Sequence, residues 1–101
     1  MSDTQKLLIE AVGTFVFLAV IFHSVDNKLI GPIGVAAALY TAINLGVDIS
    51  GAHYNPAVTF AMFMENKISF YVGLSYVTAQ LIGAYAAFMF NKEVLKKNAI
   101  V

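Results

Sequence analysis

Three long runs of apolar residues constrain this chain more than any other feature of its sequence. They cover residues 7–25, 29–47 and 68–90, and Glu10 is the one residue with a full charge inside them. Each run approaches or exceeds the roughly 20 residues that a helix needs to cross a bilayer core. The acidic and lysine residues otherwise fall between and outside the runs. This pattern predicts three membrane-spanning helices.

The composition supports lipid as the surrounding solvent. Of the 101 residues, 59% are apolar and 12% are charged. A soluble domain of this size has a large surface to cover and normally carries more charge. The absence of arginine and the zero net charge give no reason to expect a nucleic-acid partner. We expect the first run to be retained, because it is long for a signal peptide and lacks an obvious cleavage site.

The segment 48–66 does not fit a simple helical bundle. It begins with polar and small residues and becomes apolar from Pro56 onward. Asn55 followed by Pro56 is a typical helix start, with Asn as the N-cap and Pro at the first helical position. We therefore expect a loop over 48–54 and a short half-helix over 55–65. A segment of this length is too short to span and is typical of a re-entrant element.

A half-helix that begins at mid-membrane has physical consequences. Its first N–H groups lack partners within the helix, and its N-terminus carries about half a positive charge. Irregular backbone at that depth is tolerated only inside protein or beside a water-filled cavity. Carbonyl acceptors followed by an amide donor would pass water, while the dipole would repel cations.

Small residues recur every four positions in the second and third runs, which predicts close helix contacts. The two series are Gly34, Ala38, Ala42 and Gly46, and Ser75, Ala79, Gly83 and Ala87.

Three segments resemble the major intrinsic protein family of aquaporins and aquaglyceroporins. They are SGAHYNPAVT at 50–59, similar to that family's first signature loop, EAVGTF at 10–15 and YVTAQLIG at 76–83, similar to its first and third helices. The resemblance implies an all-α membrane protein with three transmembrane helices and one re-entrant half-helix, which is half of the aquaporin fold. It implies a passive channel in an inner or plasma membrane, not an enzyme, with no cofactor and no metal.

The resemblance also assigns residue roles. Asn55 would present its amide to the solute at the pore centre. The remaining roles are backbone carbonyls along the pore from Gly51, Ala52, His53 and Tyr54, and support of the loop from Glu10, Pro56, Ala57 and Gln80. For Glu10 a position near the interface is the alternative, and for Gln80 an ordinary interhelical hydrogen bond. We expect His53 to be structural or part of the pore wall, since no second metal ligand lies at a suitable spacing.

Members of the family carry two inverted repeats, whereas this sequence shows one. We expect an antiparallel homodimer of copies inserted in opposite orientations, which the weak lysine asymmetry allows. Lys6 and Lys67 would lie on one side, and Lys28, Lys92, Lys96 and Lys97 on the other. The alternatives are a complementary half-channel chain, a fragment of a full-length channel, and a non-conducting membrane packing subunit. Higher oligomers are also left open.

The selectivity filter departs from the family pattern. By the resemblance, Val58 would stand where an arginine is usual, and Val35 and Ile43 would replace bulkier aromatic or polar residues. We therefore expect a wide, apolar constriction that passes water together with small neutral solutes such as glycerol, urea or ammonia.

Overall fold

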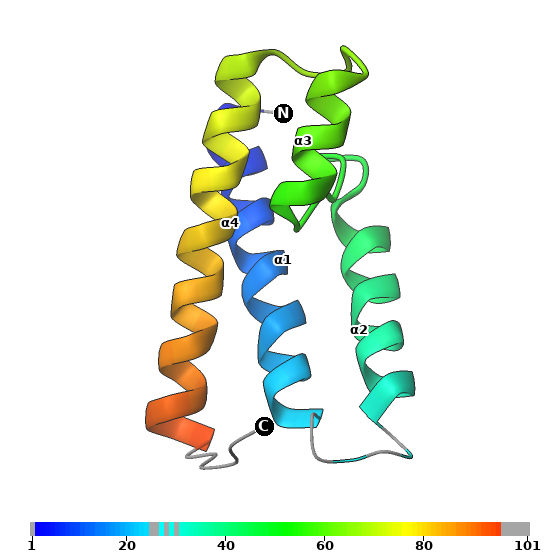
Figure 1. Ribbon diagram of the computed structural model, residues 1–101, viewed down its shortest axis with the longest axis vertical. Helices are drawn as coiled ribbons and strands as arrows, with labels where there is room; N and C mark the ends of the chain where they lie inside the picture. Colours follow the sequence, from blue (N-terminus) through cyan, green and yellow to red (C-terminus); the bar gives the residue numbers. More distant parts are fainter. Residues whose placement is uncertain (1, 25–26, 28, 30, 96–101) are drawn as a thin grey trace.

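The computed structural model describes residues 2–24, 27, 29 and 31–95, and helices are the only regular structure within those ranges. The elements are α1 (Asp3–Ser24), α2 (Gly31–Gly46), α3 (Pro56–Met64), α4 (Phe70–Phe90) and the π-helical turn η1 (Asn91–Leu95). The fold is therefore all-α, as predicted, and Figure 1 shows its helices standing roughly parallel to one long axis.

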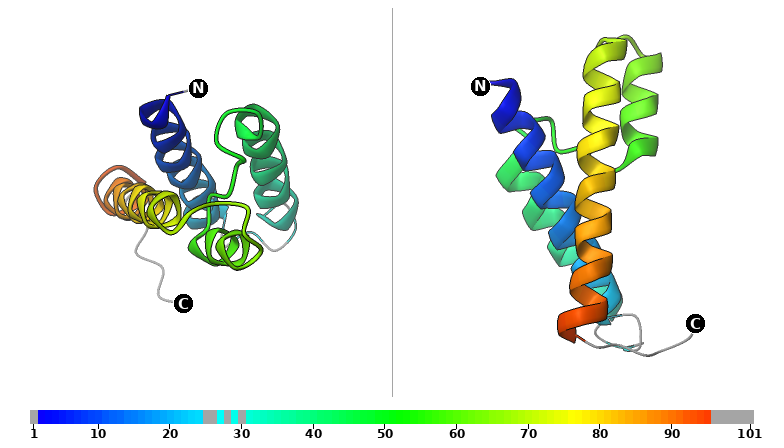
Figure 2. Two further views of the ribbon diagram at one scale, coloured as in Figure 1. Left: turned by 90° about the horizontal axis from the view of Figure 1, so that it is seen from above. Right: turned by 90° about the vertical axis from the view of Figure 1, so that its left-hand side faces the viewer.

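The path of the chain puts the start of α3 near the middle of the molecule. α1 and α4 lie side by side and run in the same direction, while α2 runs back in the opposite direction (Figures 1 and 2). After α2 the chain turns inward, and α3 begins at about mid-height and leads back to the end where α4 starts. The longest Cα dimension is 39 Å, against 24 and 23 Å across.

Two of the three expected spans are long enough to cross a bilayer. α1 has 22 residues and α4 has 21, and both are apolar enough by composition to be candidate spans. At 1.5 Å per residue each measures about 32 Å, close to the roughly 30 Å of a hydrocarbon core. α2 has only 16 residues, about 24 Å, and is shorter than a typical spanning helix.

The predicted helix boundaries over 29–47 and 68–90 need correction. α2 begins at Gly31, so Pro32 lies in its first turn, where its missing N–H costs nothing, and the helix ends at Gly46. α4 begins at Phe70 because the Ser69 hydroxyl accepts the Val72 N–H at 3.2 Å and caps the helix.

The first run also differs from its expected bounds. Helix α1 begins four residues before the predicted start, at Asp3 rather than Leu7. The expected end at Val25 lies outside the described residues.

Small residues let α1 and α4 approach closely. Ala79 and Ala87 are buried, and a Cβ added to Gly83 would overlap the carbonyl oxygen of Ala11. This contact uses the stripe of small residues predicted for the third run. Because the backbones nearly touch, α1 and α4 form the most closely packed pair among the described helices.

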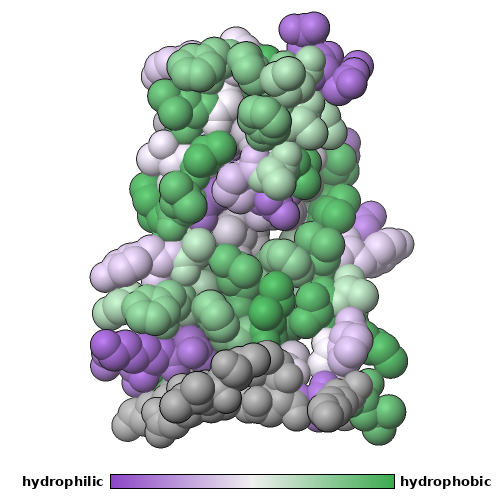
Figure 3. Space-filling view, viewed as in Figure 1, coloured by the Kyte–Doolittle hydropathy of each residue, from purple (hydrophilic) through white to green (hydrophobic). Residues whose placement is uncertain are grey.

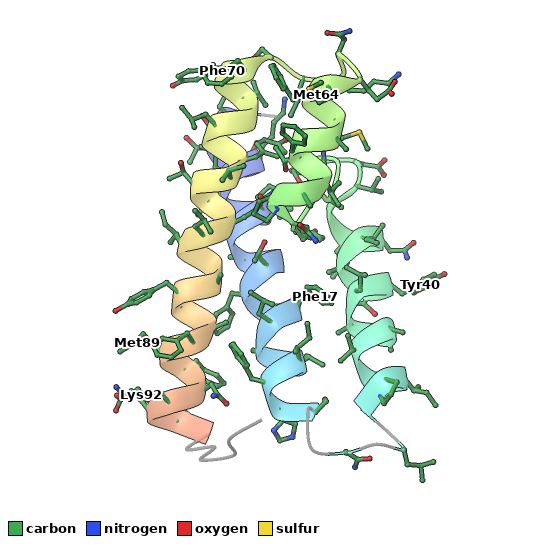
Figure 4. The ribbon with its side chains drawn as sticks, viewed as in Figure 1. Phe17, Tyr40, Met64, Phe70, Met89 and Lys92 are labelled. Atoms are coloured by element: carbon green, nitrogen blue, oxygen red, sulfur yellow. The ribbon has the colours of Figure 1, made fainter. Side chains whose placement is uncertain are left out.

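α2 is held much more loosely. Among the described helices it packs only against α1. An apolar groove of about 400 Å³ lies between the two, with Ala38, Ala42 and Gly46 of the second stripe on its wall together with Val12 and Val16 of α1. In Figure 4 the side chain of Phe17 lies between α1 and α2, while Tyr40 points away from the bundle.

The outer surface is predominantly apolar. Leu45 is 73% exposed, Tyr71 is 76% exposed and Phe60 is 64% exposed. Figure 3 shows hydrophobic side chains over most of one face, with hydrophilic atoms at mid-height where the ribbon places the start of α3. Such a surface suits a lipid environment more than water.

Candidate pore loop

Asn55 caps α3 in the manner that the Asn-Pro pair predicts. Its backbone is extended, with φ −158° and ψ 124°, and its side-chain Oδ1 accepts the N–H of Ala57 at 2.8 Å. Because a backbone N–H can only donate, the oxygen of the amide must face the helix. The Nδ2 group, with its two donors, is therefore directed away from the cap, and Asn55 is exposed in this chain.

A buried carboxylate organises the loop before α3. Glu10 is 0% exposed. Its Oε2 accepts the Ser50 hydroxyl at 2.7 Å and the His53 N–H at 2.9 Å, and its Oε1 accepts the Tyr54 N–H at 2.8 Å. The carboxylate is therefore enclosed by protein groups that donate to it.

Peptide planarity fixes the direction of the loop carbonyls. In a trans peptide the C=O points opposite to the N–H of the next residue. The N–H groups of His53 and Tyr54 point to Glu10, so the carbonyls of Ala52 and His53 point away from it. The N–H of Ala52 donates to the Ser50 hydroxyl at 3.1 Å, which turns the Gly51 carbonyl away in the same manner. Within the described part of the chain, none of these three carbonyls accepts a hydrogen bond.

The loop backbone is strained where the carbonyls are turned. Gly51 has φ 89°, and Ala52 and Tyr54 have φ values of 54° and 55°. Left-handed backbone is unfavourable for residues with a Cβ, by about 1–3 kcal/mol each when it is sparsely populated. The hydrogen bonds to Glu10 and Ser50 offset this cost and hold the loop in one conformation.

A second set of buried polar groups joins the loop to α3 and α4. Gln80 is 1% exposed, and its Nε2 donates both to Glu10 Oε1 and to Thr59 Oγ1, each at 2.8 Å. Thr59 is also 1% exposed, and its Oγ1 lies 2.8 Å from His53 Nδ1. Gln80 therefore contacts the loop-binding carboxylate and α3 at once, rather than making one ordinary interhelical bond.

Two tyrosines anchor the loop from outside this cluster. The Tyr76 hydroxyl donates to the Ser50 carbonyl at 2.6 Å, and the Tyr54 hydroxyl donates to the Ala42 carbonyl at 2.7 Å. The ring of Tyr54 fills space that Gly13 and Gly46 leave open, since a Cβ at either glycine would overlap it. The loop is thereby tied to both α2 and α4.

The three expected filter residues lie on separate parts of the surface. Val35 faces a space between α1 and α2 near Phe17 and Ile21. Ile43 on α2 is 38% exposed and Val58 on α3 is 37% exposed. Within the described residues α2 and α3 do not contact each other. A constriction from these three side chains therefore requires a second half.

Sequence reasoning missed the side chains of Ser50, Thr59 and Tyr76. The four-residue offset from Asn55 to Thr59 was the available signal, because it places both at one side of the helix start. The described residues contain no group of three or more His, Cys, Asp or Glu able to hold a metal ion.

The comparisons agree with this geometry. The sequence model for the major intrinsic protein family matches residues 30–100. A probable aquaporin of the TIP type from Medicago truncatula is 34% identical over 100 residues, which cover 84% of this chain and 40% of that protein. Aquaporin-B from Dictyostelium discoideum is 38% identical over 92 residues, which cover 82% of this chain and 31% of that protein. Aquaporin PIP2-7 from Arabidopsis thaliana is 34% identical over 104 residues, which cover 91% of this chain and 37% of that protein.

The chain belongs to the major intrinsic protein family. It spans about two fifths or less of the length of the curated relatives described above. No solved structure matches it significantly.

Proposed function

We propose that this chain supplies one half of a passive membrane channel for water and small uncharged solutes. The observation that carries the proposal is the loop of residues 51–55. Three carbonyls turned away from Glu10 lead to the exposed amide of Asn55 at the start of α3. Membership of the major intrinsic protein family supports the same function.

The loop offers a water molecule the partners that it would lose on leaving bulk water. Carbonyl oxygens accept its hydrogens, and the Asn55 Nδ2 donates to its oxygen. The N-terminus of α3 adds about half a positive charge near this point, which disfavours cations. We propose that transport is passive and bidirectional.

A second half would close the pore. α3 packs only against α4 among the described helices, and α2 only against α1, so the face between α2 and α3 is open. We propose an antiparallel second copy as the closing element. A complementary half-channel chain, or a further segment of a longer protein, would supply the same surface.

The charges agree with insertion in both orientations. Lys6 belongs to the first turns of α1 and Lys67 to the connection between α3 and α4, and these segments lie at one end of the molecule, whereas Lys92 lies at the other end (Figures 1 and 4). Lys28, Lys96 and Lys97 lie outside the described residues. Reporter fusions at the C-terminus test this part of the proposal, and a signal from one side of the membrane only would rule out dual insertion.

The filter is proposed to be wide and apolar, with Val35, Ile43 and Val58 around it. Glycerol, urea and ammonia would then pass together with water. Proteoliposomes with fast water flux, but with solute flux equal to that of protein-free liposomes, would contradict the wide filter while leaving the channel intact.

Stopped-flow swelling of proteoliposomes made from this chain tests the function itself. The informative variant is Asn55→Asp, because Asp keeps a capping oxygen but replaces the donor amide. Loss of this hydrogen-bond donor inside the completed pore is worth about 1–3 kcal/mol, so we expect water flux to fall by roughly tenfold or more. Asn66→Asp, in the exposed turn between α3 and α4, is the matched control and leaves flux unchanged. A chain with no flux above protein-free liposomes would instead be a non-conducting packing subunit.

A further inference from the structure

The amide of Gln80 has only one possible orientation in its buried site. One atom of this amide lies 2.8 Å from both Glu10 Oε1 and Thr59 Oγ1. An ionised carboxylate only accepts hydrogen bonds, so each group at Glu10 must donate to it: the Ser50 hydroxyl, the N–H groups of His53 and Tyr54, and this amide atom. The amide atom is therefore the nitrogen. Both hydrogens of Nε2 are then used, and Gln80 Oε1 is left without a partner among the described residues. An unsatisfied buried oxygen is the cost of this orientation.

The orientation of Gln80 determines where the Thr59 hydroxyl hydrogen goes. Thr59 Oγ1 accepts from Gln80, and its own hydrogen must find another acceptor. The hydroxyls of Thr41, Ser75 and Thr78 each donate to the carbonyl four residues earlier. Within the described residues, the Thr59 hydroxyl makes no such bond, and its remaining neighbour is His53 Nδ1 at 2.8 Å.

We propose that Gln80 and Thr59 are positioning residues that keep His53 neutral, with its proton on Nε2. The hydrogen bonds run in one direction: Gln80 donates to Thr59, and Thr59 donates to His53 Nδ1. With a proton on Nδ1, Thr59 Oγ1 would accept from both Nδ1 and Gln80 Nε2, and the Thr59 hydroxyl hydrogen would be buried without an acceptor among the described residues.

The two tyrosines beside His53 direct their hydroxyls elsewhere, whereas the negative charge of Glu10 opposes a neutral ring. Tyr76 of α4 packs beside the imidazole, with ring centroids 5.0 Å apart, and its hydroxyl is committed to the Ser50 carbonyl. Glu10 of α1 is the charged group that faces this residue, and it binds the backbone N–H of His53. Tyr54, the adjacent residue on the loop, directs its hydroxyl to α2.

A neutral His53 matters for the pore. Its carbonyl is one of the three directed away from Glu10, so a positive charge on the ring would lie beside the water path. This consequence rests on the proposed channel function, whereas the proton position itself does not. The Thr59 hydroxyl would keep the electrostatic potential at the pore centre independent of pH across the range in which histidines commonly titrate.

Nitrogen NMR of the full chain in lipid nanodiscs, labelled with ¹⁵N-histidine, tests the proposal. The two histidines are assigned with the His53→Gln variant. We expect a protonated Nε2 and an unprotonated Nδ1 for His53, unchanged between about pH 5 and pH 8. A protonated Nδ1, or a doubly protonated ring at neutral pH, overturns the proposal without any need for a variant.

Three variants sharpen the test. Thr59→Val keeps the shape of the side chain and removes the hydroxyl, so we expect mixed tautomers and protonation of the ring on acidification. Thr59→Ser restores the spectrum of the unmodified chain, and Thr78→Val, whose hydroxyl lies on the exposed side of α4, leaves it unchanged. A Thr59→Val spectrum identical to that of the unmodified chain overturns the proposal. None of these measurements needs conduction, so failure of the channel function would be visible separately.

Discussion

The two sides of α1 are built differently. On one side, α4 lies so close that a Cβ on Gly83 would overlap the backbone of α1, and Gln80 reaches the buried Glu10. On the other side, α2 leaves an apolar groove of about 400 Å³ and contacts no other described helix. The Tyr54 side chain joins the loop to α2 through its hydrogen bond to the Ala42 carbonyl, and the backbone N–H groups of Ile49 and Ser50 donate to the Gly46 carbonyl.

This difference separates the part that fixes the loop from the part that remains open. The loop conformation depends on α1 and α4, which supply the carboxylate, the amide and the Tyr76 hydroxyl. α2 contributes the Ala42 and Gly46 carbonyls, while among the described residues its remaining face and the exposed face of α3 make no hydrogen bond with the loop supports. These faces are therefore available for contact with a second half. Substitutions on the two sides of α1 are expected to change the free energy of unfolding by different amounts.

The largest effect is expected for Glu10→Gln. An amide nitrogen would replace one carboxylate oxygen. It would face two hydrogen-bond donors and could not accept a hydrogen bond from either of them. Leaving buried donors unsatisfied costs about 1–3 kcal/mol each, so we expect a loss of about 2–4 kcal/mol in the free energy of unfolding in detergent micelles. Glu65→Gln, on an exposed residue at the end of α3, should change it by less than about 0.5 kcal/mol. Equal losses in the free energy of unfolding for the two variants would contradict the role of Glu10 as the carboxylate that organises the loop.

A smaller loss is expected for Gly83→Ala. The added methyl group would push α1 away from α4, and overpacking of this kind costs about 1–3 kcal/mol. The matched control is Gly34→Ala on α2, where the nearest atom to a new Cβ is the Ser24 hydroxyl oxygen at 3.8 Å. There the gain in helix propensity should leave stability unchanged or raised by up to about 1 kcal/mol. A greater loss at Gly34 than at Gly83 would reverse the comparison between the two sides.

The smallest effect is expected for Tyr54→Phe. It removes the hydrogen bond to the Ala42 carbonyl but keeps the ring against Gly13 and Gly46. A typical hydrogen bond contributes about 0.5–1.5 kcal/mol, and hydrogen exchange should increase in α2 while α4 remains protected. Tyr40→Phe, at a side chain that is 71% exposed, serves as the control and should change neither quantity. Increased exchange in α4 would show that the loop is not anchored as described.

Local signals in the sequence predicted the helices and the start of α3. The apolar runs indicated three long helices, and Asn55-Pro56 predicted the cap that the structure contains. The length of α2 was overestimated, because hydropathy alone does not show that the helix begins at Gly31 and ends at Gly46. The membrane arrangement of these helices, and the roles of the pore and filter residues, stay predictions.

The cluster around Glu10 could be predicted only in outline. The sequence indicated an acid in the first helix and an amide in the last, but it could not show that Gln80 donates to both Glu10 and Thr59. Residues 70 positions apart come together here because α1 and α4 run in parallel and cross at their small residues. Such proximity depends on tertiary packing, which periodicity along one helix does not report.

The most direct test of the channel asks whether water passes the exposed side of α3. The chain contains no cysteine, so a single thiol can be placed at Val58→Cys and modified with a water-soluble reagent in proteoliposomes. Leu81→Cys, at a side chain on α4 that is 57% exposed, is the control. We predict that osmotic water flux falls on modification of Val58→Cys and is unchanged for Leu81→Cys. Unchanged flux through fully modified Val58→Cys would contradict a water path along α3.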